Sequence, residues 1–152
     1  MNTITVINDN ILNAKEDIIS QQVNCCGVMG SGLAKQIRNK YPEVFIEYYA
    51  YCKKHDILEQ MLGVAQPVKC NDNKIVMNLF GQMRYGTDRQ YTDYGALKWS
   101  MINMKEYAQK NNLSIAIPYQ IGCGLAGGNW DIVYKIIEEV FNDYDVTIYR
   151  LK

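Results

Sequence analysis

The pattern of apolar and polar positions predicts an alternation of short strands and amphipathic helices along the chain. β-formers alternate over Thr3–Asn8, and a second strand is expected at Ile18–Asn24. Leu33 and Ile37 then recur at helical spacing. That helix is expected to stop before Pro42, because the residue preceding a proline avoids helical geometry.

A second helix is expected at Glu43–His55, followed by a pair of strands. One stripe of this helix should be buried, comprising Val44, Phe45, Tyr48, Tyr49 and Cys52. The turn-rich residues 70–73 separate Leu62–Lys69 from Lys74–Phe80, which predicts two antiparallel strands.

The second half of the chain continues the alternation after a polar and aromatic loop at residues 81–92. Asp93 is a suitable N-cap for a helix that runs to about Lys110. Leu113–Tyr119 is apolar almost throughout, which is typical of a central strand covered on both faces. A helix at Asp131–Phe141 and a strand at Val146–Leu151 complete the pattern, which predicts a three-layer α/β/α domain with a central mixed six-stranded sheet.

Length and composition fit one domain over residues 1–152. Hydrophobic residues make up 48% of the chain and charged residues 21%, as in ordinary globular proteins. No apolar run approaches the roughly 20 residues of a membrane span. The start MNTITVINDN lacks the features of a secretory signal, so a cytoplasmic protein is expected, without membrane partners.

The balance of charge argues against a dedicated nucleic-acid binder. Sixteen basic and sixteen acidic residues give a formal net charge of zero, so strong non-specific binding to nucleic acid is not expected. Five cysteines without a C-x-x-C pair, and a single histidine, give poor support to a zinc site or a disulfide framework. We expect a monomer with neither metal nor cofactor, which holds any anionic ligand locally.

The first glycine-rich stretch lies between the second strand and the first helix. Gly27, Gly30 and Gly32 let the backbone turn and its amides point outward. A helix start adds free N–H groups and the positive end of its dipole. The stretch is therefore either a phosphate cradle or a tight turn without a ligand.

The second glycine-rich stretch, Gly122–Gly127, matches G-x-G-x-x-G between a strand and a helix. A Rossmann fold would need a second βαβ half, yet only about 25 residues follow the motif. A P-loop would need Gly-Lys-Ser/Thr at the end of a loop, and neither loop has it. Both loops follow strands of one sheet, so they are expected to flank one crevice that holds a diphosphate on backbone amides.

Three segments together resemble the macrodomains, a family that binds ADP-ribose and its derivatives. NDNIL resembles the family's adenine-binding segment, VNCCGVMGSGLAKQI the loop around the distal ribose, and IPYQIGCGLAGGNW the phosphate-binding loop. The last two are similar to the branch with terminal ADP-ribose glycohydrolase and phage or bacterial macrodomains. Some members of that branch are ADP-ribose-1''-phosphate phosphatases.

The resemblance implies a set of binding residues. Asp9 or Asn10 would contact adenine, Ile11 would border it, and Asn24 would approach the distal ribose. The diphosphate and ribose would be surrounded by Met29, Gly30, Ser31, Gly32, Leu33, Pro118, Gly122, Cys123, Gly124, Leu125 and Ala126. The implied partner is ADP-ribose or an ADP-ribosylated macromolecule.

Two departures from the branch concern its chemistry. The resemblance implies a nucleophilic lysine after the strand that ends near Phe80 and an aspartate after the GCGL segment. This sequence has Gln82 and Ala126 at those places. A glutamine cannot form a Schiff base and an alanine cannot move protons, so the covalent lysine mechanism is not expected.

Other side chains are candidates for chemistry. The catalytic candidates are Asn24, Gln82 and Asp88, the last as a general base if its loop folds over the ribose. Cys123 lies at the phosphate loop, where a helix dipole would lower the pKa of its thiol, although packing is the favoured role for this residue. Three functions remain open: hydrolysis of an ADP-ribose derivative, ADP-ribose binding without turnover, and binding of RNA or nucleotides.

Overall fold

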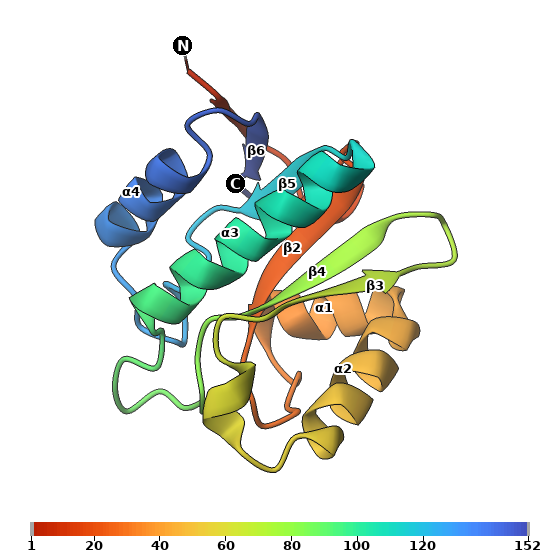
Figure 1. Cartoon of the computed structure of the whole chain (residues 1–152), viewed down its shortest axis with the longest axis vertical. Coiled ribbons are helices and arrows are strands. Elements are labelled where there is room, and N and C mark those ends of the chain that lie inside the picture. Colours follow the sequence, from red (N-terminus) through yellow and green to blue (C-terminus); the bar gives the residue numbers. More distant parts are fainter. Residues whose placement is uncertain (1, 152) are drawn as a thin grey trace.

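A mixed six-stranded sheet forms the centre of the fold in a computed structural model that describes residues 2–151 (Figure 1). The strands lie in the order β1-β6-β5-β2-β4-β3, and only the β3–β4 pair is antiparallel. Their bounds are β1 Ile4–Ile7, β2 Ile18–Val23, β3 Ala65–Lys69, β4 Ile75–Phe80, β5 Ile115–Pro118 and β6 Val146–Tyr149. The predicted mixed sheet is confirmed, including a central strand at β5.

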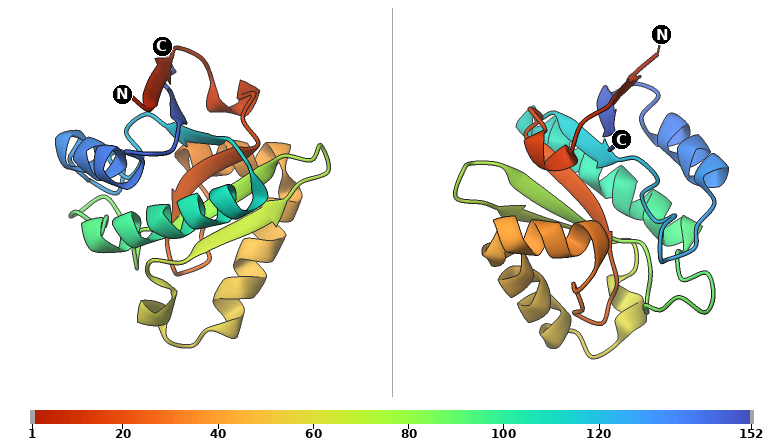
Figure 2. Two further views of the ribbon diagram at one scale, coloured as in Figure 1. Left: turned by 45° about the horizontal axis from the view of Figure 1, so that its top comes forward. Right: turned by 180° about the vertical axis from the view of Figure 1, so that it is seen from behind.

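Helices cover both faces of this sheet, which confirms the three predicted layers. The helices α1 (Gly32–Lys40) and α2 (Pro42–Lys54) lie on one face (Figure 2). The helices α3 (Tyr94–Asn111) and α4 (Trp130–Val140) lie on the other. Two 3-10 helices, η1 (Ile11–Asn13) and η2 (Leu58–Met61), lie in the connections.

The buried stripe of α2 is narrower than the sequence indicates. Val44, Tyr48 and Cys52 are buried at four-residue spacing. Phe45 is only half-buried and Tyr49 is 42% exposed, so the prediction that both are buried is wrong. Each follows a buried residue by one position, which turns its side chain about 100° away from the sheet.

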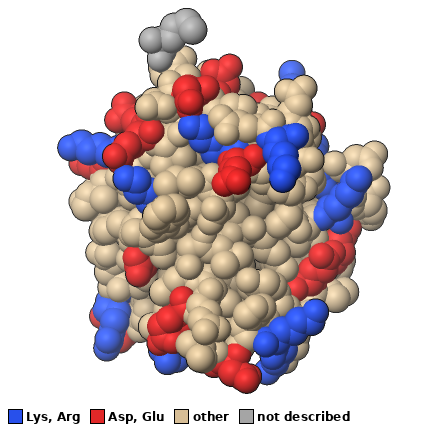
Figure 3. Space-filling view, in the orientation of Figure 1, with Lys and Arg blue, Asp and Glu red and all other residues tan. Residues whose placement is uncertain are grey.

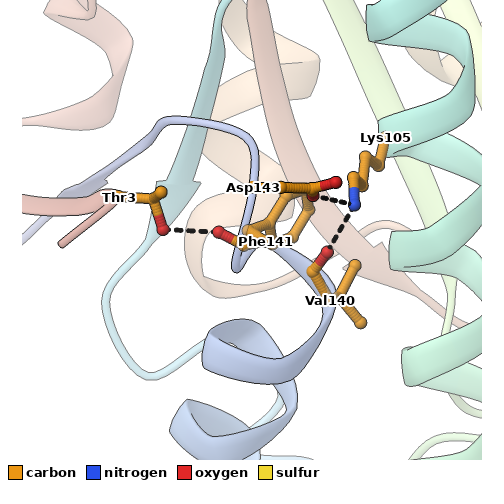
Figure 4. Close-up of polar contacts among 5 residues, drawn as sticks. All are labelled: Thr3, Lys105, Val140, Phe141 and Asp143. Atoms are coloured by element: carbon orange, nitrogen blue, oxygen red, sulfur yellow. Dashed lines mark hydrogen bonds and ion pairs between the residues drawn. The ribbon is translucent and has the colours of Figure 1, made fainter. Parts of the chain in front are cut away.

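Side-chain contacts join α3 to the end of α4, and the end of α4 to the segment before β1, near the amino ends of the parallel strands (Figure 4). Lys105 Nζ of α3 donates to the Val140 carbonyl oxygen at 2.9 Å, which places a cation at the negative end of α4, and it also pairs with Asp143. The Thr3 hydroxyl donates to the Phe141 carbonyl oxygen. The glycine loops lie at the opposite, carboxyl ends of the strands β2 and β5.

The visible surface mixes both signs of charge. On the face seen in Figure 3, Lys and Arg alternate with Asp and Glu, and no single-sign patch dominates. Within residues 2–151, no helix is both long and apolar enough to cross a membrane. In the same range, no three His, Cys, Asp or Glu side chains are grouped so that they could hold a metal ion.

Candidate functional site

A cavity of about 490 Å³ lies at the carboxyl ends of β2 and β5, within the size range of small-molecule sites. Both glycine loops contribute to its wall, as the sequence predicts for strands of one sheet. The lining comprises residues 21–24, 28–34, 85–87, 118–122 and 124–126, together with Gln82.

Asn24 organises the first wall of the cavity. Its Oδ1 accepts hydrogen bonds from the Cys26 amide at 2.9 Å and the Tyr48 hydroxyl at 2.8 Å. Its Nδ2 donates to the carbonyl oxygen of Val28 at 2.8 Å. Asn24 therefore lies at the cavity as predicted, and its side chain holds the loop that leads to α1.

The start of α1 faces the same cavity without a side-chain cap. Asp93 caps α3 by accepting from the Ala96 amide at 3.0 Å, and Asn129 caps α4 in the same way. Ser31 forms no such bond at the start of α1. The first-turn N–H groups of α1 are therefore left for another acceptor, and this arrangement suits an anion.

The second glycine loop also presents free amides. Its turns are closed by bonds from the Cys123, Gly127 and Gly128 amides to carbonyl oxygens of the same loop. Within the described chain, the amides of Gly122, Gly124, Leu125 and Ala126 donate to no other residue, and all four residues line the cavity. Gly122 adopts a left-handed φ of 75°, which favours glycine.

The loop after β4 braces this glycine loop. The amides of Tyr91 and Thr92 donate to the Ala126 carbonyl oxygen at 2.8 and 3.2 Å. The Thr92 hydroxyl donates to the Gly122 carbonyl oxygen at 2.6 Å and accepts from Gln22 Nε2 at 2.9 Å. The loop at residues 81–92 therefore holds the second glycine loop, the candidate phosphate-binding loop, in position.

Both polar atoms of the Gln82 side chain are already occupied. Its Oε1 accepts from Gln22 Nε2 at 2.8 Å, and its Nε2 donates to the Arg84 carbonyl oxygen at 2.8 Å. Gln82 lines the cavity and is 9% exposed. The Gln82 side chain therefore has a structural role in the wall of the cavity. Its amide supplies neither a nucleophile nor a general base.

Asp88, the third catalytic candidate, is not a lining residue, although the preceding Thr87 is. The Tyr91 hydroxyl donates to its carboxylate at 2.5 Å, and this bond holds the pKa of Asp88 below its usual range. The same contact raises the pKa of Tyr91. Asp88 is thus an ionised surface carboxylate that follows the lining residue Thr87 in the sequence.

Cys123 packs against the apolar cluster beneath α3 and α4 and is not a lining residue. Burial raises the pKa of its thiol to about 11. The expected lowering by a helix dipole is therefore wrong, because loss of hydration outweighs any dipole effect at this position.

Asp9, Asn10 and Ile11 do not line the cavity. The carboxylate of Asp9 accepts from the Asn10 amide at 2.7 Å, and Asn10 caps η1 by accepting from the Leu12 amide at 3.0 Å. Ile11 is buried in the apolar cluster beneath α1 and α2. Contacts of this segment with adenine stay a prediction.

Several lining residues were not predicted from the sequence. Gln21 and Gln22 are polar residues near the carboxyl end of a strand, and this position is the signal in the sequence that could indicate them. Tyr85 belongs to the loop at residues 81–92, for which the sequence predicts catalytic groups and no lining residue other than Gln82. The further lining residues not predicted are Val23, Val28, Ala34, Gly86, Thr87, Tyr119, Gln120 and Ile121.

Comparisons with known proteins match this arrangement. The family model described as Macro domain matches residues 21–137. A DNA ADP-ribosyl glycohydrolase of Mycobacterium tuberculosis is 27% identical over 151 residues, which cover 96% of this chain and 42% of that protein. An ADP-ribose 1''-phosphate phosphatase of Saccharomyces cerevisiae is 26% identical over 179 residues, with 99% of this chain and 100% of that protein covered. The solved macrodomain of Mycobacterium tuberculosis DarG has a TM-score of 0.82 at 25% identity, and the alignment covers 96% of both chains.

Proposed function

We propose that this chain, which belongs to the macrodomain family, binds ADP-ribose in the cavity at the carboxyl ends of β2 and β5. The observation that carries the proposal is the convergence of free amides on one cavity, from the start of α1 and from residues 122 and 124–126. Such amides bind a diphosphate without Lys or Arg, in agreement with the formal net charge of zero.

We further propose that the bound compound is an ADP-ribose derivative that the chain hydrolyses. The names of the mycobacterial and yeast relatives support this step, with an ADP-ribosyl group on DNA or a 1''-phosphate as the respective substrate. The chain spans less than half the length of the mycobacterial relative. An ADP-ribosyl group on protein is a third candidate substrate.

The roles in hydrolysis follow from the positions of the candidates. Asn24 orders the wall at the distal ribose, and Gln82 fixes the loop after β4. Asp88 is the nearest ionised carboxylate in sequence to the lining, one residue after Thr87. A movement of this loop toward the ribose would let Asp88 accept a proton from the attacking water.

Binding without turnover is the second candidate, and one observation favours it. Among the described residues that line the cavity, none is Asp, Glu, His, Lys, Arg or Cys. General acid–base catalysis needs a group that gains or loses a proton near the operating pH. A cavity of amides and hydroxyls recognises ADP-ribose without supplying such a group.

Calorimetry with ADP-ribose tests the binding proposal, and saturable binding at one site is expected. Incubation with ADP-ribosylated DNA, ADP-ribosylated protein and ADP-ribose-1''-phosphate then separates the two candidates. Turnover of any one of them supports hydrolysis, and turnover of none, with binding retained, supports a reader. Competition by poly(A) as strong as by ADP-ribose would favour an RNA-binding module instead.

A further inference from the structure

Two buried side-chain oxygens lack a hydrogen-bond partner within residues 2–151, and they belong to neighbouring residues. These are Oε1 of Gln21 and Oε1 of Gln22, at the end of β2. Both residues line the cavity. Buried carbonyl oxygens in proteins are almost always paired, so two exceptions side by side at one cavity require an explanation.

A chain of amides across three strands fixes the orientation of Gln21, which is only 2% exposed. Its Nε2 donates to Asn78 Oδ1 at 2.9 Å, and Asn78 Nδ2 donates to Gln66 Oε1 at 3.0 Å. Gln66 Nε2 donates to the Glu47 carbonyl oxygen at 3.2 Å. A backbone carbonyl can only accept, so Gln66 must turn its NH₂ group to Glu47, and each preceding amide is oriented in turn. The Oε1 of Gln21 is the free end of this chain.

The oxygen of Gln22 has a different environment. Its Nε2 donates to both Gln82 and Thr92, which turns Oε1 away from them. A Cβ atom built on Gly81 would lie 2.4 Å from this oxygen, and one on Gly122 would lie 2.9 Å from it. The oxygen therefore lies against the backbone of two glycines, where weak C–H contacts replace a conventional donor. Such backbone contacts explain why Oε1 of Gln22 has no conventional hydrogen-bond donor. The unpaired Oε1 of Gln21 still requires an explanation.

We infer that binding of ADP-ribose opens the buried Oε1 of Gln21 to the cavity, where this oxygen accepts a hydrogen bond from a hydroxyl of the distal ribose. The inference rests on the proposed binding of ADP-ribose. A carbonyl oxygen needs a donor, and phosphate oxygens of the ligand are acceptors at neutral pH. Gln21 lies on the strand that leads into Asn24, the wall expected to hold the distal ribose. Gln21 thus becomes a specificity-determining residue for the sugar.

The variant Gln21→Met tests this inference, because methionine keeps the length of the side chain and removes its polar atoms. The matched control is Gln109→Met, the same substitution at an exposed residue of α3 that neither lines the cavity nor belongs to the chain of amides. Calorimetry with ADP-ribose and with ADP, which lacks the distal ribose, provides the measurement. We expect Gln21→Met to weaken ADP-ribose binding about 5- to 10-fold, the usual effect of one lost hydrogen bond. Binding of ADP, and both ligands with the control, should stay within about 2-fold.

Equal affinity of Gln21→Met and the unaltered chain for ADP-ribose would overturn the inference, and so would an equal loss for ADP-ribose and ADP. ADP-ribose analogues that lack one distal hydroxyl give a second measurement on the unaltered chain, so the test does not depend on folding of the variant. Weaker binding of one analogue is expected, and unchanged binding of all would contradict the assignment. Failure of the unaltered chain to bind ADP-ribose would instead reject the proposed function itself.

Discussion

The Thr92 hydroxyl donates a 2.6 Å hydrogen bond to the Gly122 carbonyl oxygen, 30 residues away in the chain. This bond joins the loop after β4 to the glycine loop after β5. Because the Gly122 carbonyl also accepts from the Gly128 amide at 2.9 Å, one oxygen anchors both the turn and its brace. The position of the free amides at residues 122 and 124–126 therefore depends on Thr92, which does not line the cavity.

Thr92→Val should weaken this support. Valine keeps the shape of threonine and removes the hydroxyl, which leaves Gln22 Nε2 with one acceptor fewer. We expect the free energy of unfolding to fall by about 1–3 kcal/mol, as for other buried groups that lose a partner. Urea unfolding measures it, and Thr92→Ser, which keeps a hydroxyl, is the control. A valine variant as stable as the serine variant would show that the bond contributes nothing.

Substitution by alanine should affect stability and ADP-ribose binding differently at Gly122 and at Gly124. Gly122 has φ 75°, and its Cβ would approach Gln22 Oε1 to 2.9 Å, so Gly122→Ala should cost about 1–3 kcal/mol of stability. A Cβ on Gly124 would meet nothing within 4 Å. Gly124→Ala should therefore keep its stability within about 0.5 kcal/mol and weaken ADP-ribose binding by occupying the cavity. Thermal unfolding and calorimetry separate the two, and the reverse ranking in stability would refute this account of the loop.

Asp88→Asn tests whether the loop after β4 supplies a base. The bond from Tyr91 holds the pKa of Asp88 low, so the carboxylate is ionised throughout the neutral range and is lost only as pH falls through that lowered pKa. If Asp88 takes a proton from water, the variant should bind ADP-ribose normally and lose turnover by at least about 100-fold. Tyr91→Phe, which keeps the carboxylate, is the control. Unchanged turnover in Asp88→Asn would remove Asp88 from the mechanism.

Cys123 should react slowly with alkylating reagents. With a pKa of about 11, its thiol is protonated at pH 8, and its thiolate fraction is about one in a thousand. Reaction with iodoacetamide, followed by mass spectrometry of the peptide, should speed up as pH rises toward 11. Rapid modification at pH 7 that ADP-ribose prevents would instead indicate an activated thiol in the site.

The sequence predicts the sheet and both glycine loops because each depends on local signals. The apolar run at Leu113–Tyr119 indicates a central strand, and glycines at the ends of two strands indicate amides that turn toward a ligand. The side chains that complete the wall depend on partners distant in sequence. Gln21 bonds to a residue 57 positions away and Gln22 to one 70 positions away, so their orientation appears only in the folded chain.

The errors of the sequence interpretation have physical reasons. Tyr49 is aromatic, yet it follows the buried Tyr48 by one position and so lies at the side of α2. The nearby helix start predicts a lowered pKa for the Cys123 thiol, but burial of the thiol raises it.

The most direct test of the central claim is a ¹H–¹⁵N NMR titration of the chain with ADP-ribose. The amides of Gly30, Gly32, Gly122 and Gly124 line the cavity, and glycine signals are well separated in such spectra. We predict saturable shifts concentrated at residues 28–34 and 120–126. Absence of shifts at saturating ligand, or shifts confined to other regions such as the recess around Leu113 and Tyr144, would contradict the assignment of this cavity to ADP-ribose.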